Sequence, residues 1–97
     1  MLKLRITIEA HNDIFAIGQY TQNEWGEQQR RKYLNGLDQK LQWLREYWEL
    51  GKKRDDIHSG YYSSGYEKHV IFYRVTETDL EIIGIVHERS DYQNTMQ

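Results

Sequence analysis

The feature that most constrains this 97-residue chain is a row of apolar side chains near its middle. Its members, spaced by three, four, three and four residues, are Leu34, Leu37, Leu41, Leu44 and Trp48. An α-helix has 3.6 residues per turn, so this spacing puts them all on one face. The row predicts a long amphipathic helix over residues 27–49, ending at Gly51, that must bury one face against other elements.

In the residues before this helix, the spacing of apolar side chains changes once, from that of a strand to that of a helix. Residues 2–8 alternate between apolar and polar side chains, which predicts a half-buried strand. Apolar residues then recur at helical steps, which predicts a first helix over residues 10–23. Only a short break ending at Gly26 separates the two helices, so we expect an antiparallel helical hairpin.

The second half of the chain is rich in residues that favour strands. We expect strands at 57–62, 69–75 and 80–87, with Ser63-Ser64-Gly65 and residues 76–79 as turns. The predicted order is β-α-α-β-β-β, an α+β fold with the helical hairpin packed on a curled antiparallel sheet. One domain spans residues 1–97, with a polar tail at about 91–97.

Composition excludes several classes of protein. The chain has no cysteine, so it has no disulfide, thiolate nucleophile or Cys-based zinc site. Its four histidines lack the spacing of metal ligands, and no glycine-rich phosphate loop is present. We therefore expect no metal and no cofactor. The longest apolar runs are far too short to span a membrane, which favours a cytoplasmic protein without a membrane partner.

The net charge of -2 weighs against direct nucleic-acid binding, because a protein that grips phosphates needs a cationic surface. The one dense cationic run is Lys52-Lys53-Arg54, which we interpret as a solvated helix end. A second apolar stripe on the long helix, Trp43-Tyr47-Leu50, either contacts a partner or widens the core. Tyr61, Tyr62 and Tyr66 either pair across strands or stack on a base, and we favour the structural interpretation.

Several segments, in consistent order over residues 10–91, resemble the RelE/ParE family of bacterial toxins, and its ParE branch more closely. The most specific is His69-Val70-Ile71-Phe72-Tyr73-Arg74; the others are 10–21, 25–37, 50–61 and 83–91. Four positions depart from the family pattern. Proline is missing before the helix-exit glycine, Tyr62 and Gly84 replace arginines, and Ser90 replaces a methionine.

The resemblance implies the same β-α-α-β-β-β fold and a cognate antitoxin, ParD-like or of another family, that folds as it binds. It implies a toxin that inhibits DNA gyrase as ParE-like members do. A RelE-like ribosome-dependent mRNA endonuclease is the alternative, and a non-toxic protein-binding module, a decayed toxin, is the third. The negative net charge favours the gyrase poison, which is not an enzyme.

Three sets of residues follow from these interpretations. We expect the antitoxin to contact exposed aromatic residues of the two helices: Phe15, Tyr20, Trp43, Tyr47 and Trp48. We expect the target to contact the end of the last strand: His87, Glu88, Arg89, Asp91 and Tyr92. A nuclease would use His58, Arg74, His87 and Tyr92, with Lys53 or Arg54. The structural alternative is that Arg74 pairs with a carboxylate and that His87 bonds to backbone.

Overall fold

The computed structural model describes residues 1–90 of the chain. Its elements are β1 (Lys3–Ile6), α1 (Ile8–Trp25), α2 (Glu27–Tyr47), the 3-10 turn η1 (Trp48–Leu50), β2 (Lys52–Lys53), β3 (Tyr62–Tyr66), β4 (His69–Val75) and β5 (Asp79–His87). The five strands lie in the order β1-β5-β4-β3-β2. The α+β class and the order of the predicted elements are confirmed. One strand pair differs from the expectation, because β1 runs parallel to β5 while the other pairs are antiparallel.

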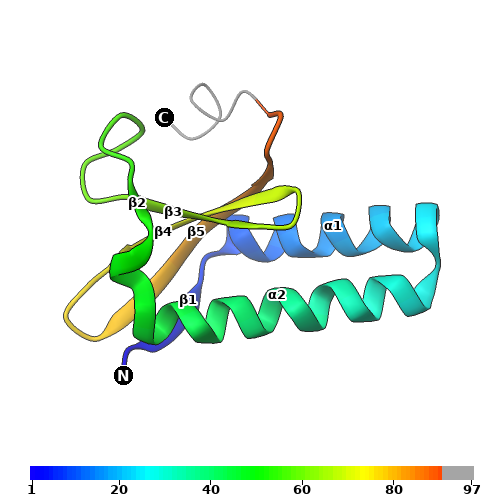
Figure 1. Ribbon diagram of the computed structural model, residues 1–97, viewed down its shortest axis with the longest axis horizontal. Helices are drawn as coiled ribbons and strands as arrows, with labels where there is room; N and C mark the ends of the chain where they lie inside the picture. The colour runs from blue at the N-terminus through cyan, green and yellow to red at the C-terminus, as the bar shows by residue number, and fades with distance from the viewer. Residues whose placement is uncertain (91–97) are drawn as a thin grey trace.

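The two helices form the expected antiparallel hairpin. Figure 1 shows α1 and α2 side by side, with the turn at Gly26 extending well beyond the sheet. Thr7 starts α1 by accepting a hydrogen bond from the Ala10 amide at 3.1 Å, which is an N-cap. Gly26 has φ of 95°, a conformation that glycine adopts without strain, and this permits the abrupt reversal.

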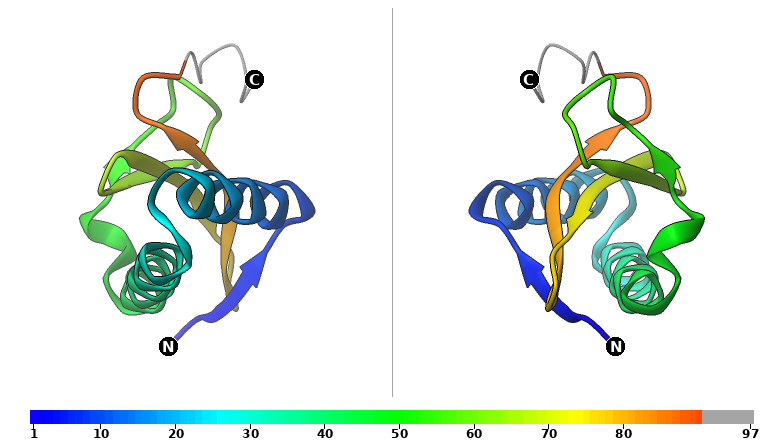
Figure 2. Two further views of the ribbon diagram at one scale, coloured as in Figure 1. Left: turned by 90° about the vertical axis from the view of Figure 1, so that its right-hand side faces the viewer. Right: turned by 90° about the vertical axis from the view of Figure 1, so that its left-hand side faces the viewer.

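The predicted stripe of α2 makes the core. Leu37, Leu41 and Leu44 are buried, together with Ala10 and Ile17 of α1. They meet the inward-facing side chains of β4 and β5, which are Ile71, Tyr73, Leu80, Ile82 and Ile85. The end-on views of Figure 2 show the two helices against the curled sheet. The helices therefore cover one face of the sheet, called here the inner face.

A β-bulge interrupts β5. Tyr73 pairs with Ile82, but its neighbour Phe72 pairs with Gly84, so Ile83 is an extra residue without a cross-strand partner. Side chains alternate between the two faces of a strand, and one extra residue shifts that alternation. The bulge lets Leu80 and Ile82 before it, and Ile85 after it, all face the helices.

Helix α1 and its cap bond to backbone groups of β5 at the bulge and just after it. The Thr7 hydroxyl donates to the Ile83 carbonyl at 3.1 Å. A carboxylate oxygen of Asp13 accepts from the Ile85 amide at 2.9 Å. Burial raises the pKa of Asp13, and the hydrogen bond from the Ile85 amide lowers it. The nearby Glu9 carboxylate raises this pKa further. The start of α1 is thus fixed to the bulge by two side-chain hydrogen bonds.

The loop over residues 54–61 covers part of the outer face of the sheet. Arg54, which we expected to be solvated, is buried and donates two hydrogen bonds to Asp56, at 3.0 and 2.9 Å. Its guanidinium also lies 5.4 Å from the centre of the fully buried Phe72 ring. Ile57 is buried in the same loop. The predicted strand at 57–62 is therefore wrong, because Ile57 is buried by loop packing and not by strand alternation.

The prediction of a turn at Ser63-Ser64-Gly65 is also wrong. These residues form the middle of β3 and pair with β4, and the actual turn lies at Glu67, whose φ is 52°. The small polar residues suggested a turn, but Ser63 is buried and its hydroxyl accepts a bond from Arg54 at 3.4 Å. Packing against the loop thus overrides local preference.

Gly51 follows η1 as predicted, but for a different physical reason. Its φ of -71° needs no glycine. The requirement is space, because the buried Tyr73 hydroxyl donates to the Trp48 carbonyl at 2.7 Å beside it. A Cβ atom at residue 51 would lie only 1.9 Å from that hydroxyl oxygen and 3.0 Å from the Ser63 carbonyl oxygen.

Replacing Gly51 by alanine is therefore expected to lower the free energy of unfolding by about 1–3 kcal/mol, as overpacking of a rigid site does. Urea unfolding monitored by tryptophan fluorescence measures the change. Gly65→Ala is the matched control, because the nearest atom to its Cβ lies 4.0 Å away. The control should change stability by less than about 0.5 kcal/mol. Equal losses in both variants would contradict the explanation.

Candidate functional site

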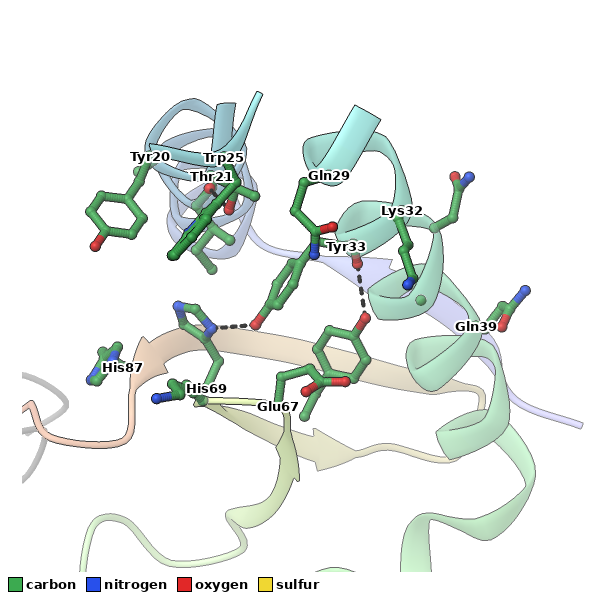
Figure 3. Close-up of a pocket in the computed structure, with 16 residues that line it drawn as sticks. Tyr20, Thr21, Trp25, Gln29, Lys32, Tyr33, Gln39, Glu67, His69 and His87 are labelled. Atoms are coloured by element: carbon green, nitrogen blue, oxygen red, sulfur yellow. Dashed lines mark hydrogen bonds between the residues drawn. The ribbon is translucent and has the colours of Figure 1, made fainter. Parts of the chain in front are cut away.

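A cleft of about 1620 Å³ lies between the helical hairpin and the turn joining β3 to β4. Its lining is rich in aromatic and imidazole side chains: Tyr20, Trp25, Tyr33, Tyr66, His69 and His87. Figure 3 shows Tyr20 and Trp25 on α1, Tyr33 on α2, and His69 and His87 at the ends of β4 and β5. Tyr66 is the last residue of β3. The outer part of the hairpin extends past the sheet, and this leaves the cleft open beneath it.

Two histidines occupy the floor of the cleft. His69 and His87 are direct cross-strand partners, and their ring centroids are 5.6 Å apart in an edge-to-face arrangement. His69 also forms a short hydrogen bond through Nδ1 with the Tyr33 hydroxyl of α2. The Arg89 amide donates to Nδ1 of His87 at 3.1 Å. The β5 bulge accounts for the placement, because His87 shares a face with Ile85.

The floor of the cleft favours uncharged forms. Burial lowers the pKa of His69, with a further lowering from His87 and an opposite effect from Glu88. Burial raises the pKa of Tyr33 to about 12. At neutral pH the pair is therefore a neutral imidazole beside a protonated phenol.

A second tyrosine fixes the wall of the cleft. The Tyr66 hydroxyl donates to the Tyr33 carbonyl at 2.9 Å, and the two rings meet edge to face at 5.0 Å. Gly36 makes room for this bond, because a Cβ there would lie 2.1 Å from the Tyr66 oxygen. The cross-strand and packing contacts of Tyr62 and Tyr66 agree with the structural interpretation of these tyrosines.

The cleft continues along α2 onto the second aromatic stripe. Gln39 lines the cleft, and Trp43 and Tyr47 follow it at four-residue spacing on the same side of the helix. Trp43 and Tyr47 are 40% and 43% exposed, and their rings lie 5.1 Å apart. The stripe is therefore surface and not core. We call the cleft together with Trp43 and Tyr47 the aromatic track.

The other predicted antitoxin residues fall in different places. Tyr20 lines the cleft and is exposed. Phe15 is exposed too, but five residues from Tyr20 on a helix correspond to a rotation of about 140°, which puts it on another side of α1. Trp48 is half-buried, and its ring packs edge-on against Tyr62 at 5.6 Å.

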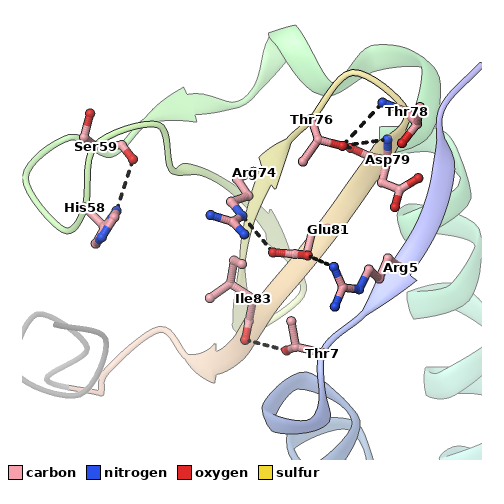
Figure 4. A network of polar contacts seen from close by, with 10 residues as sticks. All are labelled: Arg5, Thr7, His58, Ser59, Arg74, Thr76, Thr78, Asp79, Glu81 and Ile83. Atoms are coloured by element: carbon pink, nitrogen blue, oxygen red, sulfur yellow. Dashed lines mark hydrogen bonds and ion pairs between the residues drawn. The ribbon is translucent and has the colours of Figure 1, made fainter.

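Among residues 1–90, the structure does not bring His58, Arg74 and His87 of the suggested nuclease together. Figure 4 shows Arg74 on the outer face of the sheet, where Arg74 and Arg5 both bond to the buried carboxylate of Glu81, at 2.7 and 2.8 Å. His87 faces the cleft on the inner side. His58 lies at the exposed loop beside Ser59. Arg74 thus pairs with a carboxylate, and His87 accepts a hydrogen bond from the Arg89 backbone amide, as the structural alternative expected.

The other predicted site residues that the structure describes lie away from Arg74 and His87 or are exposed at the end of β5. Arg54 is buried against Asp56, and Lys53 is exposed on β2. Glu88 and Arg89 are exposed after β5. Asp91 and Tyr92, and the predicted tail at 91–97, lie outside the described residues.

Sequence reasoning missed Tyr33, His69, Tyr66 and Trp25 as site residues. His69 shares the alternation of the buried Ile71 and Tyr73, which could have placed it on the inner face. Tyr33 precedes Leu34 and lies beside the main stripe of α2. Nothing local indicates that these two residues meet, because they are 36 positions apart in the chain.

Within residues 1–90, no three histidine, cysteine or acidic side chains gather as a metal site would require. Over the same residues, neither helix is long and apolar enough to cross a membrane.

The fold and the cleft define a small α+β domain with an open, aromatic surface suited to a protein segment. Comparison with protein families is consistent with this description. The family model "ParE toxin of type II toxin-antitoxin system, parDE" matches residues 4–92. The chain therefore belongs to the ParE toxin family, which confirms the resemblance.

Characterised relatives cover most of the chain. It is 28% identical to Toxin ParE1 of Caulobacter vibrioides over 88 residues, which span 91% of each protein. It is 29% identical to Toxin ParE1 of Mycobacterium tuberculosis over 77 residues, 78% of this chain and 79% of that protein. A solved structure, "Chromosomal ParDE TA system from P. aeruginosa", superposes with a TM-score of 0.78 over 90% of this chain and 96% of that one. At 20% identity the last comparison shows a shared fold.

The histidine pair predicts a pH dependence of stability. The pKa of His69 is lower in the folded protein than the ordinary 6.5, so the unfolded chain binds more protons in mildly acidic solution. This contribution is fully present above about pH 6.5 and is lost as pH falls toward the folded pKa. We expect His69→Gln to weaken the loss of stability between about pH 7.5 and 5.

Urea unfolding at a series of pH values measures this difference. His58→Gln is the matched control, because His58 is exposed on the loop. A pH profile of His69→Gln that parallels those of the wild type and the control would contradict the assignment.

Proposed function

We propose that this ParE-type toxin inhibits DNA gyrase and that a cognate antitoxin neutralises it by occupying the aromatic track. The observation that carries the antitoxin part is the continuity of the cleft with the exposed Trp43 and Tyr47. Family membership supports the toxin and its antitoxin. Gyrase as the target rests on the resemblance to the ParE branch.

The dimensions of the track suit a peptide segment. Residues 29–47 of α2 border it from end to end, a length of about 27 Å at 1.5 Å per residue. An 18-residue helix, or a strand of about eight residues, would match that length. Aromatic side chains are enriched among the residues that dominate binding energy, and the track exposes them in a row.

The proposed target surface overlaps the antitoxin surface. His87 belongs to the floor of the cleft and begins the segment His87, Glu88, Arg89, Asp91 and Tyr92, which we propose for target contact. A segment bound in the cleft would cover His87. Neutralisation then follows from direct competition for the end of β5, with no conformational change in the toxin.

Arg74 and His87 lie on opposite faces of the sheet. They therefore cannot act together on one phosphate, as a nuclease would require. Phosphoryl transfer requires an acid, a base and cations around one phosphate. In the described residues, the Arg74 guanidinium is bound to Glu81 on the side away from the cleft. The gyrase mechanism is therefore the better supported of the two.

Trp43→Ala is expected to weaken antitoxin binding at least about tenfold, because it removes an aromatic anchor from the track. Isothermal titration calorimetry with the purified antitoxin measures the effect. Phe15→Ala is the matched control, since it removes an exposed aromatic ring of α1 that does not line the cleft. Unchanged affinity in a folded Trp43→Ala variant would contradict the proposed surface.

The target is tested by two assays run side by side on the purified toxin. We expect accumulation of cleaved DNA with gyrase, and no cleavage of ribosome-bound mRNA. Deletion from Arg89 onward should abolish the gyrase effect while the fold remains. The reverse pattern would support the endonuclease, and inactivity in both assays with no growth arrest on expression would support a non-toxic binding module.

A further inference from the structure

We propose that His69 and His87 together form a site that binds the carboxylate of an acidic side chain. This inference rests on the proposed function, because the acidic side chain would belong to the antitoxin segment that fills the cleft. It goes further by naming the chemical group that the polar floor of the cleft recognises.

The hydrogen bond at His87 determines which ring nitrogen carries the proton. A backbone amide can only donate, so Nδ1 of His87 must accept the bond from Arg89 with its lone pair. In the neutral ring the proton is then on Nε2. His87 therefore presents an Nε2–H donor.

The same reasoning applies to His69. The raised pKa of Tyr33 keeps its phenol protonated at neutral pH, and the hydroxyl bonds to Nδ1 of His69. We assign this phenol as the donor and Nδ1 of His69 as the acceptor. The proton of His69 is on Nε2 as well. Both rings use Nδ1 within the protein and leave the Nε2–H group free to donate.

No described residue accepts a hydrogen bond from either Nε2–H group. The two rings lie 5.6 Å apart and line the same cleft. A carboxylate has two oxygens that can each accept a hydrogen bond, so one carboxylate bound between the rings can accept from both. The two Nε2–H donors thus need acceptors from a bound group, and a carboxylate provides two acceptor oxygens.

The charges around the floor favour an anion of modest charge. Lys32 of α2 and Lys68 of the β3–β4 turn both line the cleft, and Glu67 is the acidic residue of the lining. Glu88 and Arg89 follow His87 on the other side. One net positive charge among the lining side chains, with two neutral donors, suits a carboxylate better than a dianionic phosphate.

Imidazole NMR on the full chain labelled with ¹⁵N-histidine tests the site with acetate as the probe. We expect both His69 and His87 to carry the proton on Nε2. We expect acetate to shift these two Nε2 signals along one saturable curve, against sodium chloride at equal ionic strength. His11 and His58 are internal controls, because both are exposed and lie outside the cleft.

Three results would overturn the proposal. They are a proton on Nδ1 of either ring, equal acetate shifts at all four histidines, and saturation by inorganic phosphate at lower concentration than by acetate. The last result would indicate a phosphate site, as on a nucleic acid.

Two variants of His87 distinguish the effect of the N–H donor from the effect of the aromatic ring. His87→Phe keeps an aromatic ring but removes the donor, and should weaken acetate binding about tenfold, the usual effect of losing a charge-assisted hydrogen bond. His87→Gln keeps an N–H donor and should retain most of the affinity. Equal affinity of both variants and the wild type would contradict the role of the Nε2–H group.

The antitoxin complex distinguishes this inference from the proposed function. We expect His87→Phe to weaken antitoxin binding about tenfold and His87→Gln to restore most of it. If the antitoxin binds all three proteins equally, the carboxylate site is wrong, while the proposed track stands. If acetate binds as expected but the antitoxin binds independently of Trp43 and His87, the proposed function of the cleft is wrong.

Discussion

The β-bulge at Ile83 is the feature on which the rest of the structure depends. It adds one residue to β5 between two runs that both face the helices, so Ile82 and Ile85 can enter one core. Buried backbone groups need hydrogen-bond partners. Thr7 and Asp13 bond to the Ile83 carbonyl and the Ile85 amide, which fixes the start of α1 to β5 at the bulge.

The bulge also builds the cleft. Without the extra residue, the strand's alternation would turn His87 to the outer face, away from α2. With it, His87 meets His69 under the helical hairpin, and Tyr33 reaches down to complete the floor. The same backbone irregularity thus closes the core at one end of β5 and shapes the floor of the cleft at the other.

The two faces of the sheet differ in which side chains they leave accessible. On the outer face, Glu81 holds Arg5 and Arg74, and Arg54 lies over Phe72, so these three arginines are bound within the protein. The inner face continues past the core into aromatic and imidazole groups that remain accessible. Two of the four positions that depart from the family pattern are packed within the structure. Gly84 lies opposite buried Phe72, and Tyr62 packs between Trp48 and Tyr73.

The sequence alone determined both helices and the order of elements, because helical periodicity is a local property that side-chain spacing reveals. It also revealed a second aromatic stripe on α2, but only the structure showed that this stripe is exposed. It misplaced Ile57 and Ser63, whose burial depends on a loop folding over a distant strand. The site was decided by tertiary structure. Tyr33 and His69 are far apart in the chain, and an extra residue in β5 sets the direction of His87, so no local pattern could show that these three side chains share one cleft.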